Sequence, residues 1–380
     1  MIYRKLGRTG VDVGIIGLGA EYLEHEPEKT VVSVVHEAVD SGVNYIDLFL
    51  ASPGVRDNIG KALINKRQKV MVAGHLGAVM RNGQYSRSRD NDESLTYFDD
   101  LLTRLRTDYI DVLMLHYVDK QDDYERVFDH EGPLGVALRL KKEGKARFIG
   151  MSSHNVPTSL RAVDSGYIDV LMFSINPAFD MLPEEMPEIS KRVILYHQSP
   201  AAVNKTFTAR QALYHACAVQ NVALVAMKPY AAGVLFRDNP SSIILTPVQC
   251  LSYALSQPAV CTAVPGCHTV AEVQGALAFL KATEEEKDFS AIQRNPMWKV
   301  RGNCMYCNHC LPCPVSIDIG TLTKITDTAS FVMNDSVAAE YRALKVKASA
   351  CTECGECLER CPFGVDVIAN MSRAVQVFGE

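Results

Sequence analysis

Eight of the twelve cysteines lie after residue 300, in two closely spaced runs. The first run has two residues in every gap and ends before a proline; it consists of Cys304, Cys307, Cys310 and Cys313. The second run also ends before a proline, but its last gap holds three residues; it consists of Cys351, Cys354, Cys357 and Cys361. The second spacing is that of bacterial ferredoxins, and the first is one residue shorter.

Two-cluster ferredoxins exchange one ligand between the runs, because the fourth cysteine of each run binds the other cluster. One predicted [4Fe–4S] cluster is therefore held by Cys304, Cys307, Cys310 and Cys361. The other is held by Cys351, Cys354, Cys357 and Cys313. Zinc and disulfides are the alternatives, but zinc sites usually use two separated ligand pairs rather than runs of four. The remaining cysteines have apolar surroundings and are predicted to be buried hydrophobes; they are Cys217, Cys250, Cys261 and Cys267.

Composition and charge limit the partners of the chain. Hydrophobic residues make up 47% of the 380 residues and charged residues 22%, which is ordinary for a globular protein. A net charge of −5 gives no attraction to nucleic acid or acidic membranes. There is no apolar run of about 18 residues, and the first residues lack the pattern of a signal peptide. We expect a cytoplasmic protein without nucleic-acid or membrane partners, and the oligomeric state stays open.

The first 290 residues alternate between apolar runs and amphipathic segments. Eight strands are predicted, at residues 13–19, 44–49, 69–76, 109–118, 146–154, 169–176, 222–229 and 260–266. Near-continuous apolar runs are typical of parallel strands buried on both faces, and segments such as 28–42 have helical spacing. The pattern predicts an α/β fold, a (β/α)₈ TIM barrel over residues 1–290. Residues 291–380 are predicted to form a C-terminal ferredoxin-like α+β iron–sulfur domain.

Histidines are predicted at the C-terminal ends of several strands, where barrel active sites lie. His75, His116 and His154 end the third, fourth and fifth strands, and Asp47 lies near the end of the second. The long segment 177–209 adds His197 and a strand-like run at 193–197. These groups predict a proton relay or a substrate site, with a bound metal as one option. The alternative is that they are hydrogen-bonded residues of the barrel wall.

Several segments resemble the aldo/keto reductase family. They are YRKLGRTGVDV, GVNYIDLF, DYIDVLMLH, GKARFIGMSSHN and KPYAAGVL. The segments GNCMYCNHCLPCPVSIDI and ACTECGECLERCPFGVDV resemble the branch of that family with a fused ferredoxin-type C-terminus. The resemblance covers essentially the whole chain, and it implies the same barrel and the same appended iron–sulfur domain.

The resemblance also implies a catalytic set of Asp, Tyr, Lys and His that works with NADPH. Asp47 matches the aspartate and His116 the histidine, whereas Ser52 stands at the tyrosine position and His75 at the lysine position. A serine hydroxyl is a far weaker acid than a phenol, and an imidazole lacks the permanent charge of lysine. His154 completes the candidate catalytic residues.

For the cofactor, the resemblance implies nicotinamide contacts at Ser152 and Ser153, and Lys228 could contact an anionic ligand. Met172 stands where the family usually has glutamine on the sixth strand. The loop that should bind the phosphate has His268 but no arginine or lysine. We therefore do not expect tight NADPH binding.

Iron–sulfur clusters transfer single electrons, whereas nicotinamide transfers a hydride. The sequence therefore favours an iron–sulfur oxidoreductase whose two clusters relay electrons to or from a small organic substrate at the barrel mouth. An external donor or acceptor such as ferredoxin or flavodoxin would be the partner. Two alternatives stay open. One is an NAD(P)H-dependent carbonyl reductase with a non-standard proton donor, for which Tyr22, Tyr117 and Tyr230 are candidates. The other is a non-catalytic electron-transfer protein.

Overall fold

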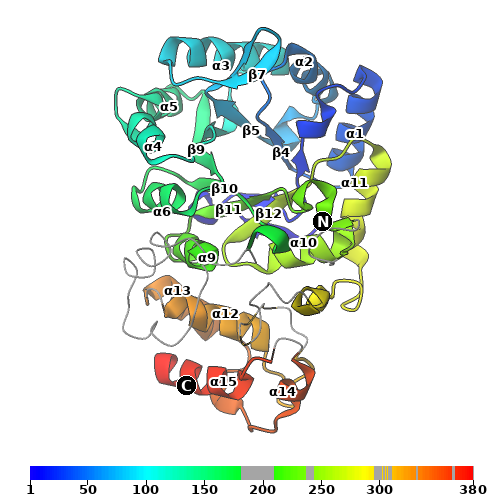
Figure 1. The fold of residues 1–380 in the computed structure, drawn as a ribbon, viewed down its shortest axis with the longest axis vertical. Helices are drawn as coiled ribbons and strands as arrows, with labels where there is room; N and C mark the ends of the chain where they lie inside the picture. The colour runs from blue at the N-terminus through cyan, green and yellow to red at the C-terminus, as the bar shows by residue number, and fades with distance from the viewer. Residues whose placement is uncertain are drawn as a thin grey trace. The chain divides into compact units, whose positions relative to one another are not determined.

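The computed structural model describes most of the chain, which Figure 1 shows as a ribbon. The described residues are 1–180, 209–236, 244–294, 302, 304, 306, 310–330, 333–361 and 364–379. They group into two compact units. The first consists of Met1–Ile175, Asn221–Tyr230 and Val260–Ala282, and the second of Asn176–Gln220, Ala231–Ala259 and Thr283–Glu380. This grouping does not follow the predicted division at residue 290, which stays a prediction.

Eight parallel strands form the sheet of the first unit, in the order β3-β4-β5-β8-β9-β10-β11-β12. They are β3 (Leu18–Gly19), β4 (Tyr45–Leu48), β5 (Met71–Leu76), β8 (Ile110–Leu115), β9 (Ala146–Ser153), β10 (Val170–Ser174), β11 (Ala223–Met227) and β12 (Val260–Val264). The two edges meet, because Gly17 donates to the carbonyl of Ala263 at 2.8 Å and Gly19 to that of Pro265 at 2.9 Å. The sheet is thus nearly closed, and the predicted eight-stranded α/β barrel is confirmed.

Two antiparallel hairpins accompany the barrel and were not predicted. The apolar run 13–19 is divided, because β2 (Asp12–Gly14) pairs with β1 (Tyr3–Lys5) and only Leu18–Gly19 enters the barrel. The second hairpin follows β5 and consists of β6 (Ala78–Arg81) and β7 (Gln84–Arg87). Its turn residues Asn82 and Gly83 have φ angles of 53° and 74°, as a two-residue type I′ turn requires.

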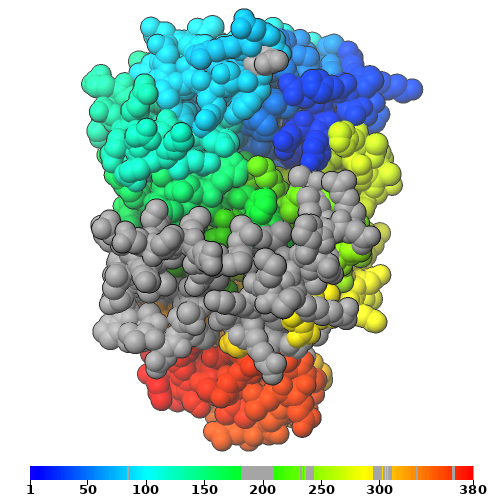
Figure 2. Space-filling view, in the orientation of Figure 1, coloured from blue at the N-terminus to red at the C-terminus, as the bar shows by residue number. Residues whose placement is uncertain are grey.

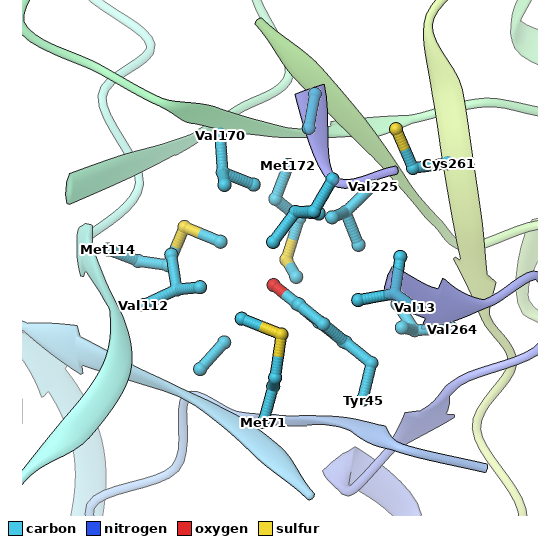
Figure 3. Packing of buried hydrophobic residues seen from close by; sticks show 13 residues of the cluster. Val13, Tyr45, Met71, Val112, Met114, Val170, Met172, Val225, Cys261 and Val264 are labelled. Carbon is cyan, nitrogen blue, oxygen red and sulfur yellow. The ribbon is translucent and has the colours of Figure 1, made fainter. Parts of the chain in front are cut away.

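Side chains from alternate strand positions fill the barrel interior (Figure 3). Residues two apart on a strand point to the same face, so pairs such as Val112 and Met114 enter the core together. Met172, at the family's glutamine position, is one of these buried core residues. The interior is therefore a packed core rather than a pore, and chemistry is confined to its ends.

Helices of the first unit follow its strands. They are α1 (Glu28–Asp40), α2 (Pro53–Ala62), α3 (Asn91–Leu105), α4 (Gln121–Phe128), α5 (Pro133–Lys142), α6 (Val156–Asp164) and α11 (Val270–Leu277). In α1, which the sequence predicted, Val31, Val34, Val35 and Ala38 form one buried stripe at helical spacing. Figure 2 shows, in the orientation of Figure 1, the outer face that the described residues present.

In the second unit, the described elements are largely helical. The α-helices are α7 (Pro177–Asp180), α9 (Ala209–Val219), α10 (Pro247–Ser256), α12 (Ile319–Ala329), α13 (Asp335–Ala343), α14 (Glu356–Arg360) and α15 (Val367–Phe378). No strand is found among the described residues after 300, so the ferredoxin-like α+β fold stays a prediction. The predicted strand at 193–197 and His197 lie outside the described residues.

None of the helices in the described ranges is both long and apolar enough to cross a lipid bilayer.

Candidate functional site

Polar side chains gather where β4, β5 and β8 end. Asp47 lies in β4, His75 in β5, and His116 directly follows β8. All three side chains are buried. Because parallel strands end at the same edge of a barrel, neighbouring strands bring these residues together. The sequence predicted that they would converge, and in this structure they touch.

The three residues and Tyr85 form one hydrogen-bonded chain, which we call the relay (Asp47, His75, His116 and Tyr85). His75 places its Nε2 2.9 Å from Oδ1 of Asp47 and its Nδ1 2.8 Å from Nδ1 of His116. On the far side of His116, Nε2 lies 2.5 Å from the hydroxyl of Tyr85. The relay therefore connects a buried carboxylate to a phenol through two imidazoles.

One set of protonation states satisfies all three contacts. His75 donates from Nε2 to the carboxylate, His116 donates from Nδ1 to His75, and Tyr85 donates to Nε2 of His116. Burial, followed by the nearby charge of His75, lowers the pKa of His116 well below its usual 6.5, so this ring is neutral at neutral pH. Burial raises the pKa of Tyr85 above its ordinary value, so the phenol keeps its proton.

Tyr85 was missed by the sequence analysis, because its segment has no strong apolar pattern. The Asn82–Gly83 dipeptide between two short runs is a hairpin signal and would have predicted β6 and β7. In the structure Phe49 stacks on the ring of His116, with 5.8 Å between centroids, and meets Tyr85 edge-on at 5.7 Å. The Tyr85 side chain is 40% exposed although its hydroxyl reaches a buried imidazole.

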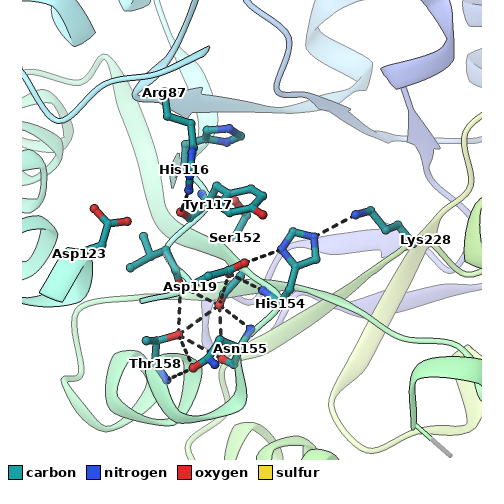
Figure 4. A network of polar contacts seen from close by, with 12 residues as sticks. Arg87, His116, Tyr117, Asp119, Asp123, Ser152, His154, Asn155, Thr158 and Lys228 are labelled. Atoms are coloured by element: carbon teal, nitrogen blue, oxygen red, sulfur yellow. Dashed lines mark hydrogen bonds and ion pairs between the residues drawn. The ribbon is translucent and has the colours of Figure 1, made fainter. Parts of the chain in front are cut away.

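A second polar group surrounds His154, which follows β9 (Figure 4). Nδ1 of His154 lies 3.1 Å from Oδ2 of Asp119, and its Nε2 lies 3.0 Å from Nζ of Lys228. Burial alone would raise the pKa of Asp119, but hydrogen bonds from His154 bring this pKa below its usual value. This arrangement orients the imidazole so that it accepts a hydrogen bond from the lysine. Burial raises the pKa of Glu21, the charge of Lys228 lowers it, and the charge of Asp47 raises it further.

The predicted cofactor serines already have partners within the protein. Ser153, which is 0% exposed, donates to the carbonyl of Val118 at 2.7 Å. Ser152 accepts from the backbone N–H of Tyr117 at 2.8 Å. Ser52 precedes α2, and its buried hydroxyl has no hydrogen-bond partner within the described residues. A cofactor at Ser152 or Ser153 would compete with these internal hydrogen bonds, and the roles assigned to the three serines stay predictions.

Two acidic side chains contact the loop before α11, where the family resemblance implies the phosphate site. Glu272 accepts hydrogen bonds from the backbone N–H groups of His268 and Thr269. Nδ1 of His268 lies 3.2 Å from a carboxylate oxygen of Glu26. A helix N-terminus attracts anions through such N–H groups, but here a carboxylate of the same helix already uses them. A phosphate at this loop would have to displace Glu272.

Four cysteines from both runs line one cavity. Cys313 of the first run lies there with Cys351, Cys354 and Cys357 of the second. Arg360 donates to the carbonyls of Pro312 at 2.6 Å and Cys310 at 3.3 Å, which holds the two runs together. Four thiols in a largely apolar cavity fit one predicted [4Fe–4S] ligand set. Cys307, which belongs to the other set, lies outside the described residues.

Cysteines elsewhere are buried, as predicted; they are Cys217, Cys250, Cys261 and Cys267. Burial raises the pKa of both Cys250 and Cys267 to about 12, so these groups remain protonated thiols and poor ligands. In the parts of the chain that the structure describes, no three His, Cys, Asp or Glu side chains are grouped to hold a single metal ion. The option of a metal at the mouth histidines gains no support from this geometry.

Known proteins resemble both parts of this chain. The model of the aldo/keto reductase family matches residues 13–249, and that of the 4Fe-4S dicluster domain matches residues 302–365. The uncharacterized oxidoreductase YqkF of Bacillus subtilis is 27% identical over 311 residues, which are 78% of this chain and 98% of that protein. The aldo-keto reductase YhdN of the same organism is 28% identical over 197 residues, which are 50% of this chain and 56% of YhdN.

Solved structures show the same fold. An aldo-keto reductase from Bacillus halodurans, in its holo form, has a TM-score of 0.58 at 22% identity and covers 77% of this chain and 96% of its own. One from Klebsiella pneumoniae in complex with NADPH has a TM-score of 0.54 at 16% identity, with 77% and 95% covered. Since the family model alone matches more than half of its residues, this chain belongs to the aldo/keto reductase family and is an oxidoreductase of that family with a 4Fe-4S dicluster domain.

Proposed function

We propose that this chain is an iron–sulfur oxidoreductase in which two [4Fe–4S] clusters supply or accept single electrons for a small organic substrate at the barrel mouth. The observation that carries the proposal is the buried contact between His75 and His116, with Asp47 behind His75. A histidine at the family's lysine position replaces a fixed charge by a group that can pass a proton on. This change suits a site that must match single electrons with protons.

Each residue of the buried part has a distinct task. Asp47 fixes the orientation of His75, because its Oδ1 lies 2.9 Å from Nε2 of that ring. His116 is held neutral by burial, so it can accept a proton on one nitrogen while it releases one from the other. Together they can deliver a proton to the mouth each time the substrate gains an electron.

The remaining parts of the proposal concern ligands, domains and partners. The two ligand sets are those predicted from the runs, and the shared cavity of Cys313 with the second run supports one of them. We retain residues 1–290 as the barrel domain and 291–380 as the cluster domain. A one-electron carrier such as ferredoxin or flavodoxin is the partner whose chemistry matches such clusters.

An NAD(P)H-dependent carbonyl reductase is the second candidate. It is favoured because Asp47 and His116 occupy the family's catalytic positions at the ends of the same strands. The carboxylate of Glu272 at the loop before α11 and the occupied hydroxyl of Ser153 both disfavour the cofactor. The two candidates differ in what reduces the substrate, so they can be separated directly.

The test uses full-length protein prepared without oxygen and aromatic aldehydes as probes. Clusters reduced by dithionite should be reoxidised by a probe, as followed by visible absorbance, and NADPH alone should give no turnover. The variant His116→Gln should slow reoxidation by about 10²-fold, because it removes one proton-transfer group. His130→Gln, at an exposed histidine outside the relay, should match the wild type. Turnover driven by NADPH alone would overturn the proposal.

A further inference from the structure

A phenol reaches the mouth by a route that the family resemblance does not imply. The tyrosine position of the family holds Ser52, whereas the hairpin β6–β7 brings Tyr85 to within 2.5 Å of His116 Nε2. We propose that Tyr85 is the residue that donates the proton to the substrate, and that the rest of the relay reloads it. The inference rests on the proposed function only for the source of the electrons.

Position and exposure single out Tyr85 within the relay. Asp47, His75 and His116 are all buried, so a substrate cannot reach their protons directly. The Tyr85 side chain is 40% exposed, and it is the outermost member of the chain. Phe49 packs against both Tyr85 and His116, which holds the phenol close to the imidazole. A substrate oxygen at the mouth would therefore meet Tyr85 first.

Two of the tyrosines considered from sequence have other contacts. Tyr22 stacks on His268, with 4.7 Å between ring centroids, in the loop before α11. Tyr117 lies beneath the guanidinium of Arg87 at 4.1 Å, and its ring centroid lies 5.0 Å from that of His154 and 6.2 Å from that of His116. Tyr85 is the tyrosine whose hydroxyl contacts the catalytic-position histidine in the described residues.

The proton transfer can be written as a shift between two states of the relay. In the loaded state His75 is an imidazolium paired with Asp47, His116 carries its proton on Nε2, and Tyr85 directs its proton outward. When an electron reaches the substrate, the Tyr85 O–H bond breaks and a new O–H bond forms on the substrate oxygen. Tyr85 then takes the Nε2 proton of His116, and Nδ1 of His116 takes the Nδ1 proton of His75.

The discharged state has the hydrogen-bond directions described above for the three contacts of the relay. His75 is then neutral, and every proton of the relay points inward towards Asp47. One proton has left and the reduced clusters have supplied one electron, so charge balances within the step. A proton from water then binds the oxygen of Tyr85, the inward proton of Tyr85 passes to Nε2 of His116, and the Nδ1 proton of His116 passes to His75. This restores the loaded state, and a second round completes a two-electron reduction.

The test compares Tyr85→Phe with Tyr167→Phe. Tyr167 is 37% exposed and also contacts a histidine, with 3.2 Å between its hydroxyl and His130, but it lies outside the relay. Reduction of an aromatic aldehyde by dithionite-reduced protein should be slowed at least about 10²-fold by Tyr85→Phe and left unchanged by Tyr167→Phe. The solvent deuterium isotope effect of the wild type should change only in Tyr85→Phe.

A second measurement does not depend on turnover. The ¹⁵N resonances of the His116 ring should shift in Tyr85→Phe, because Nε2 loses its donor, and should stay in place in Tyr167→Phe. Tyr85→Phe activity within twofold of the wild type would overturn the inference, as would unchanged His116 resonances. If NADPH rather than the clusters drives the aldehyde reaction, the proposed function fails while the same Tyr85 comparison still decides the inference. A wild type inactive with either donor would contradict both.

Discussion

At the residue scale, the main feature of the candidate site is a histidine that burial keeps neutral inside the protein. Burial makes the charged form of His116 costly, and the charge on His75 adds to the cost. A neutral ring can donate from one nitrogen and accept at the other, which an imidazolium cannot do. The depressed pKa of His116 is a consequence of burial, and the proposed proton transfer along the relay would require it.

This depressed pKa predicts a loss of stability in acid. The folded protein keeps His116 neutral, whereas the unfolded chain binds a proton there below about pH 6.5, so stability falls as the pH drops below that value. At about pH 5.5 the loss should reach about 1.4 kcal/mol. Urea unfolding at pH 7.5 and 5.5 should show this extra loss in the wild type and in His130→Gln. An equal loss in His116→Gln would contradict the assignment.

At the element scale, the hairpin β6–β7 decides which phenol reaches the relay. It begins two residues after β5 ends at Leu76 and returns to α3 through Ser88, whose N–H donates to the carbonyl of Gly77 at 2.9 Å. Tyr97 of α3 donates to the carbonyl of Met80 at 2.6 Å and anchors the hairpin. These contacts turn a short insertion into a fixed support for Tyr85.

Gly77 provides a test of that support. Its φ is +93°, and a Cβ atom there would lie 2.8 Å from the carbonyl oxygen of Ser88. Gly77→Ala should therefore lower the free energy of unfolding by about 1–3 kcal/mol and slow substrate reduction as Tyr85 moves. Gly54→Ala, where no atom lies within 4 Å of the new Cβ, should be neutral or slightly stabilising. Thermal unfolding and substrate reduction would be measured for both variants. An equal effect of the two substitutions would contradict this role of the hairpin.

At the scale of the whole molecule, the chain combines a barrel with a 4Fe-4S dicluster domain in which parts of the two cysteine runs lie close together. Arg360 of the second run bonds to the carbonyl of Pro312 next to Cys313 of the first. Cys313 in turn lines the cavity of Cys351, Cys354 and Cys357. Loss of one cysteine should therefore affect the cluster assigned to the other run.

Cysteine variants test whether each cluster takes its fourth ligand from the other run. Cys313→Ala and Cys351→Ala should lose the same electron paramagnetic resonance signal, and each should reduce iron from about eight to about four atoms per chain. Cys361→Ala and Cys304→Ala should share the loss of the other signal. Cys267→Ala, at a buried thiol of the first unit, should retain both clusters. If Cys313→Ala instead lost the signal that Cys304→Ala loses, the ligand assignment would be wrong.

Sequence alone determined the barrel strands and the family, because buried parallel strands leave near-continuous apolar runs and the cysteine spacing is fixed by cluster geometry. It also determined that Asp47, His75 and His116 end neighbouring strands. Strand periodicity is a local property, so a single chain suffices to read it. A local pattern also misplaced the first strand. The run 13–19 is apolar throughout, so it does not show that its first part, β2, pairs with β1 outside the barrel.

Only the tertiary structure decided which groups touch. Tyr85 lies 31 residues from His116 in the sequence, and their contact depends on the twist and turn of a hairpin. The internal bonds of Ser153 and the acids around His268 likewise join segments that are distant in the chain. Side-chain contacts between separate elements depend on packing in three dimensions, and no local pattern encodes them. The tertiary structure therefore showed that the barrel places the phenol of Tyr85 beside His116.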